Sequence, residues 1–151
     1  MYNPYVHKYI HGNNEFRRYT TKSRPTFITE DNNGIVWVGT IDDGLFEIDK
    51  KTGKTTNHRF SPLDPLSISS NSFSPSQKTP IVFDEDNNVW VGTNNGLNFF
   101  NRKTKTFRRF FPQDDNNSIS SKKINTLHID GDNLWVGTAS GLDQVNTKTM
   151  E

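Results

Sequence analysis

The sequence contains no cysteine and only two methionines among its 151 residues. The absence of cysteine excludes disulfide bonds, thiolate metal ligands and cysteine nucleophiles, although it does not assign a cellular compartment. No apolar run approaches the roughly 18 residues that a membrane-spanning helix needs. Residues 1–4 lack the basic and apolar regions of a secretory signal. We therefore expect no membrane contact from this segment and no signal peptide within it.

The chain also has no excess of charge of either sign. Its 18 Lys and Arg residues are balanced by 17 Asp and Glu residues, which leaves a formal net charge of +1. Such a balance gives no broad field to steer the chain toward nucleic acid or an anionic membrane. Residues 102–111 interleave cations with aromatic rings, as a platform for single-stranded nucleic acid would. Because Phe16-Arg17-Arg18-Tyr19 repeats that pattern, we interpret it as a recurring outer strand and expect no nucleic-acid partner.

What the chain does have is a repeat. The sequence Trp-Val-Gly-Thr occurs three times, beginning at Trp37, Trp90 and Trp135. The steps, from 37 to 90 and from 90 to 135, are 53 and 45 residues long. A repeat of this length that holds several short strand patterns is typical of a β-propeller blade. The sequence therefore predicts an all-β fold, a β-propeller fragment of about three four-stranded antiparallel blades.

Each repeat has the same internal order. An apolar strand is followed by an acidic, amide-rich turn, by the strand with Trp-Val-Gly-Thr, by a strand that begins at Gly-Leu, and by a fourth strand. Asx residues and Gly favour such hairpin turns. The pattern predicts the end of a preceding blade at residues 5–20, two blades at 26–60 and 80–111, and an incomplete blade at 124–147.

The repeated Trp and Gly residues are predicted to be structural. Because side chains alternate along a strand, Trp37 and Gly39 share one face of it. We expect each Trp to be buried between blades, and each Gly to leave room for a ring from the adjoining blade. The residues with this role are Trp37, Gly39, Trp90, Gly92, Trp135 and Gly137.

No metal site is predicted. Residues 84–88 read Asp-Glu-Asp-Asn-Asn, like the start of a calcium loop, but Val89 replaces the Gly at the sixth place and Asn95 replaces the Glu at the twelfth. We interpret this stretch as a hairpin turn. His7 and His11 have no third ligand nearby in the sequence. We expect no metal and no cofactor.

The residues from Asp31, reading Asp-Asn-Asn-Gly-Ile-Val-Trp-Val-Gly-Thr, are followed by Gly-Leu-Phe-Glu-Ile-Asp from Gly44 and Lys-Thr-Gly from Lys51. This pattern resembles the two-component regulator propeller repeat, which is typical of the extracytoplasmic sensor region of bacterial hybrid two-component systems. The resemblance implies a periplasmic location, a parent protein with a histidine kinase domain, and the sensing of carbohydrate breakdown products. The family motif is structural, so it supplies no binding residue.

Binding residues are expected where the repeats differ. Alternating strand direction places the loop between the second and third strands on the same face as the connections between blades. The connection before the second full blade is lengthened by residues 71–79, which we expect to form a surface loop. The candidates, chosen to stack on a sugar ring or to hydrogen-bond its hydroxyls, are Asp42, Asp43, Phe73, Gln77, Asn94 and Asn95.

The leading interpretation is a noncatalytic sensor segment that recognises a glycan-derived ligand, an oligosaccharide, or relays its binding. The first alternative is a scaffold for protein contacts with no small ligand. A lyase of the streptogramin-lyase type has loosely similar repeats, but it would need a catalytic His on the central face, and we expect none of the four His residues in an inter-strand loop of that face. A Ser-His-Asp constellation has no support either, because the nucleophile elbow Gly-x-Ser-x-Gly is absent. We expect no catalytic residue. We also expect self-association by blade completion, with residues 15–19 of one chain added as the fourth strand to residues 134–146 of another.

Overall fold

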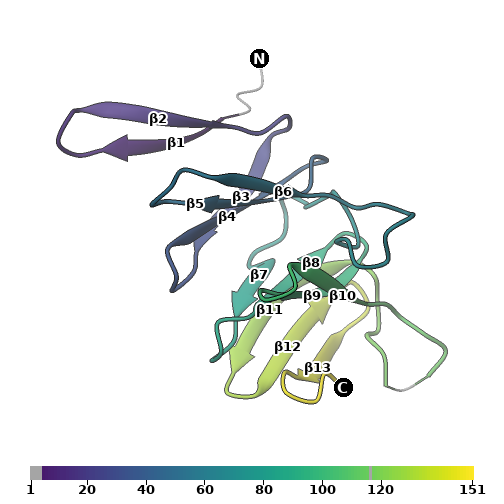
Figure 1. The fold of residues 1–151 in the computed structure, drawn as a ribbon. Helices are drawn as coiled ribbons and strands as arrows, with labels where there is room; N and C mark the ends of the chain where they lie inside the picture. Colours follow the sequence, from purple (N-terminus) through teal and green to yellow (C-terminus); the bar gives the residue numbers. More distant parts are fainter. Residues whose placement is uncertain (1–4, 116) are drawn as a thin grey trace.

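The computed structural model describes residues 5–115 and 117–151, so residues 1–4, which were compared with a secretory signal, lie outside it. The described part of the chain is all-β, with thirteen strands in four antiparallel sheets. It contains no helix that is long and apolar enough to cross a membrane. The sheets are stacked in chain order (Figure 1).

The first two sheets hold the N-terminal half of the strands. The hairpin sheet pairs β1 (Tyr5–Ile10) with β2 (Glu15–Thr20). Sheet 1 has the order β3-β4-β5-β6. Its strands are β3 (Pro25–Glu30), β4 (Ile35–Thr40), β5 (Leu45–Asp49) and β6 (Thr55–His58).

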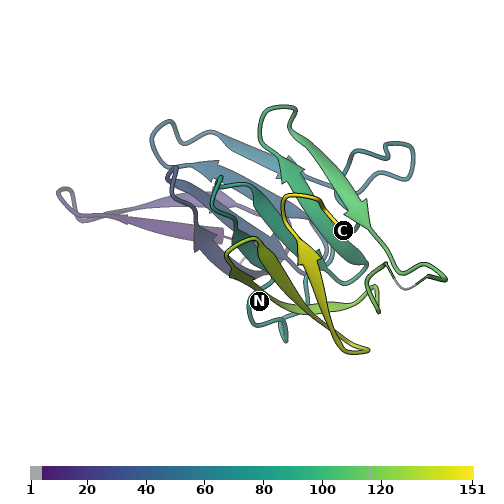
Figure 2. The same ribbon diagram turned by 90° about the horizontal axis from the view of Figure 1, so that it is seen from below.

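The other two sheets follow in the same manner. Sheet 2 contains β7 (Ile81–Phe83), β8 (Val89–Thr93), β9 (Gly96–Asn101) and β10 (Thr106–Phe110). Sheet 3 has three strands, β11 (Ile124–Asp130), β12 (Asn133–Thr138) and β13 (Leu142–Asn146). In Figure 2, seen from below, sheet 3 is nearest the viewer and the hairpin sheet is farthest. The predicted fold class, antiparallel propeller-like sheets in an all-β chain, is confirmed.

The strands that carry Trp-Val-Gly-Thr form the centre of the stack. Every residue of β8 is buried, because sheets 1 and 3 cover its two faces. One core cluster, with Trp37 and Phe100, joins sheets 1 and 2, and another, with Trp90 and Leu134, joins sheets 2 and 3. A smaller cluster around Val38 joins sheet 1 to the hairpin sheet. The nearly continuous apolar sequence of β8 therefore agrees with its burial on both faces.

The expectation that every repeat Trp is buried is correct for Trp37 and Trp90, which are fully buried, and wrong for Trp135. Trp135 is only half-buried. Its neighbours in the second core cluster, Leu134 and Val136, point toward sheet 2. Since side chains alternate along β12, Trp135 projects from the opposite face of sheet 3, which no described sheet covers.

The expectation about the glycines also needs correction. A Cβ on Gly39 would lie 2.0 Å from the ring of Phe27, but Phe27 is the residue opposite it in the same sheet. Likewise, a Cβ on Gly137 would meet Thr126 of its own sheet at 2.7 Å. Gly92 alone of the three faces an adjoining sheet, where Ile124 lies 2.3 Å from the Cβ position. The space is therefore filled mainly by the cross-strand partner, the closest neighbour on a sheet face.

Trp90→Ala and Trp135→Ala are expected to differ in cost. Removing the fully buried ring of Trp90 from a packed core should lower the free energy of unfolding by about 3–5 kcal/mol. Removing the half-buried ring of Trp135 should cost clearly less, because part of that ring already contacts water. Urea unfolding of both variants measures the difference, and equal costs would contradict the assignment of Trp135 to an open face.

Candidate functional site

The loops predicted to form the binding face do lie together at one end of the stack. The backbone N–H of Gly44 donates to Asn71 O at 2.9 Å, and that of Phe73 donates to Thr40 O at 3.0 Å. The N–H of Asn94 donates to Ser72 O at 3.2 Å. Residues 71–73 therefore lie between the β4–β5 loop of sheet 1 and the β8–β9 loop of sheet 2.

The ring of Phe73 does not belong to this surface. It is fully buried in the core between sheets 1 and 2. It packs edge-on against Phe27, with ring centroids 5.3 Å apart. The prediction that Phe73 stacks on a sugar ring is therefore wrong. The one aromatic residue of this segment therefore belongs to the core between the two sheets and not to the surface.

Gln77 is buried as well, and its amide is saturated. Nε2 donates to the carbonyls of Gly92 at 3.1 Å and of Ile124 at 2.7 Å, and Oε1 accepts the N–H of Ser74 at 2.8 Å. The next two residues pair with β11, since Thr79 O accepts the N–H of Leu127 at 2.8 Å. The connection that was expected to be a surface loop instead ties sheet 2 to sheet 3.

Asp43 has a similar structural role. It is buried, and its Oδ2 accepts the backbone N–H of Lys22 at 3.0 Å. Its carboxylate also forms an ion pair with Arg59. These contacts join the connection from the hairpin sheet to the end of sheet 1. A buried carboxylate with these partners does not face a ligand.

Three predicted residues remain at the surface. Asp42 and Asn95 are exposed and Asn94 is half-buried. Nδ2 of Asn94 donates to Ser72 Oγ at 2.8 Å, whereas its Oδ1 is buried with no hydrogen-bond partner among the described residues. Of the six predicted residues, only Asp42 and Asn95 are therefore exposed, and Nδ2 of Asn95 also donates to Ser69 O at 3.4 Å.

The opposite end of the stack contains a carboxylate that sequence reasoning had assigned only to a turn. Oδ1 of Asp31 accepts the backbone N–H groups of Asn33 at 2.8 Å and Ile35 at 3.0 Å, which closes the β3–β4 hairpin. Its Oδ2 accepts the indole N–H of Trp37 at 2.9 Å. Arg102 of sheet 2 also donates to this oxygen at 2.6 Å.

The same arrangement recurs in sheet 2. Asp84 accepts the N–H of Asn88 at 2.8 Å and the indole N–H of Trp90 at 3.3 Å. The interpretation of residues 84–88 as a hairpin turn is therefore confirmed. In the described ranges, no group of three His, Cys, Asp or Glu residues is arranged to hold a metal ion. The signal that could have revealed this pairing is an Asp six residues before the Trp, present in both full repeats.

Arg102 links two sheets through this carboxylate. Its guanidinium lies over the Trp37 ring, 5.7 Å from the centroid, and its Nε donates to Asn87 O at 2.5 Å. Burial by itself raises the pKa of Asp31, but the hydrogen bonds from Trp37, Arg102 and the Ile35 backbone outweigh it and hold the pKa below its ordinary value. Asp31 is therefore charged and fully paired at neutral pH.

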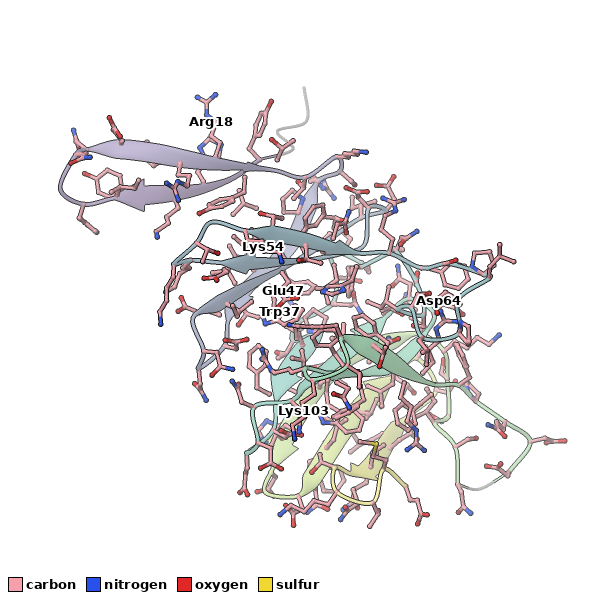
Figure 3. The ribbon with its side chains drawn as sticks, viewed as in Figure 1. Arg18, Trp37, Glu47, Lys54, Asp64 and Lys103 are labelled. Carbon is pink, nitrogen blue, oxygen red and sulfur yellow. The ribbon has the colours of Figure 1, made fainter. Side chains whose placement is uncertain are left out.

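A groove of about 430 Å³ lies beside these residues, lined by side chains of sheet 1 and by Lys105 of sheet 2. Glu47, which Figure 3 labels close to Trp37, contributes Oε2 at 3.0 Å from His58 Nε2 and Oε1 at 3.1 Å from Lys105 Nζ. The hydrogen bond with His58 is the largest influence on the pKa of Glu47 and lowers it; burial opposes this and Lys105 lowers it further. The sequence prediction had not included this trio.

Comparison with known proteins supports the fold. No family model matches the sequence, so the resemblance to the two-component regulator propeller repeat is not confirmed by this comparison, and the search of curated proteins found no match. The extracellular domain of a hybrid two-component system from Bacteroides thetaiotaomicron matches 91% of this chain, at a TM-score of 0.73 and 17% identity. PorZ, a surface component of the type-IX secretion system of Porphyromonas gingivalis, matches 85% at a TM-score of 0.62 and 22% identity. Inactive virginiamycin B lyase from Staphylococcus aureus matches 93% at a TM-score of 0.51 and 12% identity.

The chain spans 20% of the first of these proteins, 18% of the second and 58% of the third. At such identities the likeness establishes a shared architecture of stacked antiparallel sheets. It therefore places the chain in a fold class that includes an extracellular domain of a two-component system, a surface component of a secretion system and a lyase.

Asp31→Asn should lower the free energy of unfolding at pH 7 by about 3–5 kcal/mol, because it leaves Arg102 without its charged partner in a buried site. The native carboxylate has a depressed pKa, so its contribution is complete above about pH 5 and is lost as the pH falls below the unfolded pKa of about 4. The variant should lose less stability over that range. Urea midpoints between pH 3 and 7 test this, with Glu30→Gln at the half-exposed Lys50 pair as a control that changes little.

Gln77→Ala should cost about 1–3 kcal/mol, because it leaves the Gly92 and Ile124 carbonyls without a donor. The neighbouring residue provides a matched control, since Lys78→Ala truncates an exposed side chain and should change stability by less than about 0.5 kcal/mol. Urea unfolding followed by Trp fluorescence compares the two. Identical midpoints would mean that the connection is an independent surface loop after all.

Proposed function

We propose that this chain is a noncatalytic segment of the sensor region of a two-component regulatory protein. The observation that carries the proposal is the likeness over 91% of the chain to the extracellular domain of a hybrid two-component system, with a TM-score of 0.73. The corresponding values are 0.62 for the secretion component and 0.51 for the lyase. The resemblance of the Trp-Val-Gly-Thr repeat to the two-component regulator propeller repeat points the same way. The proposal includes a location outside the cytoplasm.

A noncatalytic role agrees with the distribution of reactive side chains. His7, His58 and His128 lie in β1, β6 and β11, which belong to three different sheets. The most buried of these bases is His58, which lies in the outer strand β6. Its ring packs between aromatic rings and is paired with Glu47. A general base must reach a proton of its substrate, and this imidazole is committed to the inter-sheet contact.

The proposed ligand is glycan-derived, and its site is the loop end where Asp42 and Asn95 are exposed and Asn94 is half-buried. Carboxylate and amide groups hydrogen-bond sugar hydroxyls directly. Since Phe73 is buried, recognition at this surface rests on hydrogen bonds rather than on ring stacking. The segment can also relay binding, because residues 71–79 connect the loop end to sheets 1, 2 and 3.

The scaffold alternative has one specific observation in its favour. Large apolar side chains are exposed on the chain, among them Leu63 at 94% and Leu142 at 67%. Exposed apolar surface of this kind is typical of protein contacts. In that case the loop end would bind no small ligand.

Calorimetric titration of the protein with a panel of oligosaccharides tests the ligand. Asp42→Ala combined with Asn95→Ala should weaken binding roughly tenfold, the equivalent of about one lost hydrogen bond to a ligand. Asp86→Ala, an exposed carboxylate in the β7–β8 turn at the other end of the stack, is the matched control and should leave binding unchanged.

Sensing itself is tested separately, in the full-length gene product. A bound oligosaccharide should change the phosphorylation of that protein, and the double variant should shift the response to higher ligand concentration. Binding only at the opposite end, or no response to any member of the panel, would favour the scaffold.

A further inference from the structure

At the end of the stack opposite the loop end, a guanidinium joins sheet 1 to sheet 2. Arg102 lies in the turn after β9, and its Nη2 donates to Oδ2 of Asp31 at 2.6 Å. Its Nε donates to Asn87 O, within sheet 2, at 2.5 Å. The Arg102 side chain, which is 17% exposed, therefore connects a carbonyl of its own sheet to the buried carboxylate of the preceding sheet.

The turn after β13 has the same backbone form, with a threonine in place of that arginine. Oδ1 of Asn146 accepts the N–H groups of the residues two and three positions later, as Oδ1 of Asn101 does in the turn after β9. Met150 and Lys105, which follow these asparagines in the two turns, both occupy the left-handed position, at φ 61° and 59°. Thr147 therefore stands where the neighbouring turn has its arginine.

The threonine side chain keeps one of the two contacts that the arginine makes. Oγ1 of Thr147 donates to Asp132 O at 3.2 Å. Asp132 lies shortly before Trp135 in its hairpin, at the same spacing as Asn87 before Trp90, so the two carbonyls correspond. The hydroxyl ends at that carbonyl, and the short side chain does not extend to the preceding sheet as the arginine does.

The carboxylate that corresponds to Asp31 is Asp84, and it has no cation beside it. It is 9% exposed and accepts hydrogen bonds from the Asn88 backbone at 2.8 Å, the Asn88 amide at 3.1 Å and the Trp90 indole at 3.3 Å. These donors are all neutral. No Lys or Arg among the described residues forms an ion pair with Asp84. The charge of this buried carboxylate is therefore uncompensated, which is costly.

A hollow of about 270 Å³ lies between Asp84 and Thr147, which both line it. Its walls carry carboxylates and a single ammonium, from Asp84, Glu85, Asp86, Asp132 and Lys148. The hydrogen bond and the charge of Asp132 raise the pKa of Lys148, and the charges of Glu85 and Asp86 raise it further. The field in the hollow therefore favours a positive charge.

The hollow does not depend on a fourth strand in sheet 3. In sheet 2 the chain after the corresponding turn becomes β10, which pairs Thr106 with Asn101 and Phe110 with Leu97. This strand thus runs back along β9 toward the loop end and away from Arg102, which lies in the turn before it. A strand that followed the turn after β13 in the same way would leave the hollow open.

We propose that this hollow binds a guanidinium group, carried by an arginine side chain of a protein or by a small guanidinium compound. The group takes the position that the Arg102 guanidinium has between sheets 1 and 2, with Asp84 in the role of Asp31. A guanidinium suits a partly buried acidic site, because it is always charged, is weakly hydrated and presents several donors in one plane. Phe99, which also lines the hollow, provides an apolar surface for the alkyl stem.

NMR titration of the whole chain with N-acetylarginine amide tests the proposal, independently of any sensing role. The reporter is the indole N–H of Trp90, because it donates to Asp84. Its signal should shift and saturate at millimolar concentration. The indole N–H of Trp37 should not shift, since its carboxylate is already paired with Arg102. N-acetylcitrulline amide, which has the same shape without the charge, should move neither signal.

Substitutions in the hollow probe the site itself. Thr147→Arg should fill it from within, as Arg102 does in the neighbouring contact, and weaken binding at least roughly tenfold. Glu85→Gln combined with Asp86→Asn removes two exposed charges and should weaken binding about threefold. Circular dichroism checks folding, and the double variant decides if Thr147→Arg unfolds. Asp42→Asn, at the loop end, is the matched control and should change nothing.

The source of the guanidinium is separated by two further probes. Tighter binding of the peptide Gly-Arg-Gly than of agmatine assigns the hollow to an arginine side chain, and equal or weaker binding assigns it to a small compound. A Trp90 signal that does not move, or that moves equally with the citrulline compound, would overturn the proposal. So would binding that neither Thr147→Arg nor the double variant weakens.

Discussion

The pairing of an indole N–H with a turn carboxylate organises each full sheet of this chain. The carboxylate of Asp31 closes the hairpin through two backbone N–H groups and orients Trp37 through the other oxygen. With its only polar atom satisfied, the ring can be fully buried without cost, and it forms the surface on which the next sheet packs. Arg102 then joins that sheet to the same oxygen. A local turn and a long-range contact thus share one functional group.

The groove around Glu47 extends this arrangement toward the outer strands. His58 is stacked on Trp37 at 6.1 Å between ring centroids and is bonded to Glu47, while Lys105 comes from sheet 2. The charged groups compensate one another in pairs, so the contact between the sheets can be polar at its rim and aromatic at its centre.

The repeat pattern predicted the fold class because periodic Trp-Val-Gly-Thr strands and Asx turns are local signals. It did not predict which side chains of the connections between sheets are buried. Phe73 and Gln77 lie in a segment rich in Ser and Pro that resembles an exposed loop, yet the segment fills a space set by three sheets. Likewise, the partner of Gly39 is decided by strand register, which places Phe27 opposite it. The Gln77 contact joins residues of different repeats, so a pattern within one repeat does not reveal it. Exposed Asp42 and Asn95 follow from loop position alone and were predictable.

Gln77 hydrogen-bonds Ile124, and Thr79 hydrogen-bonds Leu127. The connection at residues 71–79 therefore depends on sheet 3, which follows it in the chain. On a ribosome the chain emerges N-terminus first, and domains generally fold as units in that order. Residues 71–79 have no complete set of partners until β11 has been synthesised. Sheet 2 therefore acquires its native surroundings only after the following repeat is available, and the smallest cooperative folding unit in this region is larger than one repeat.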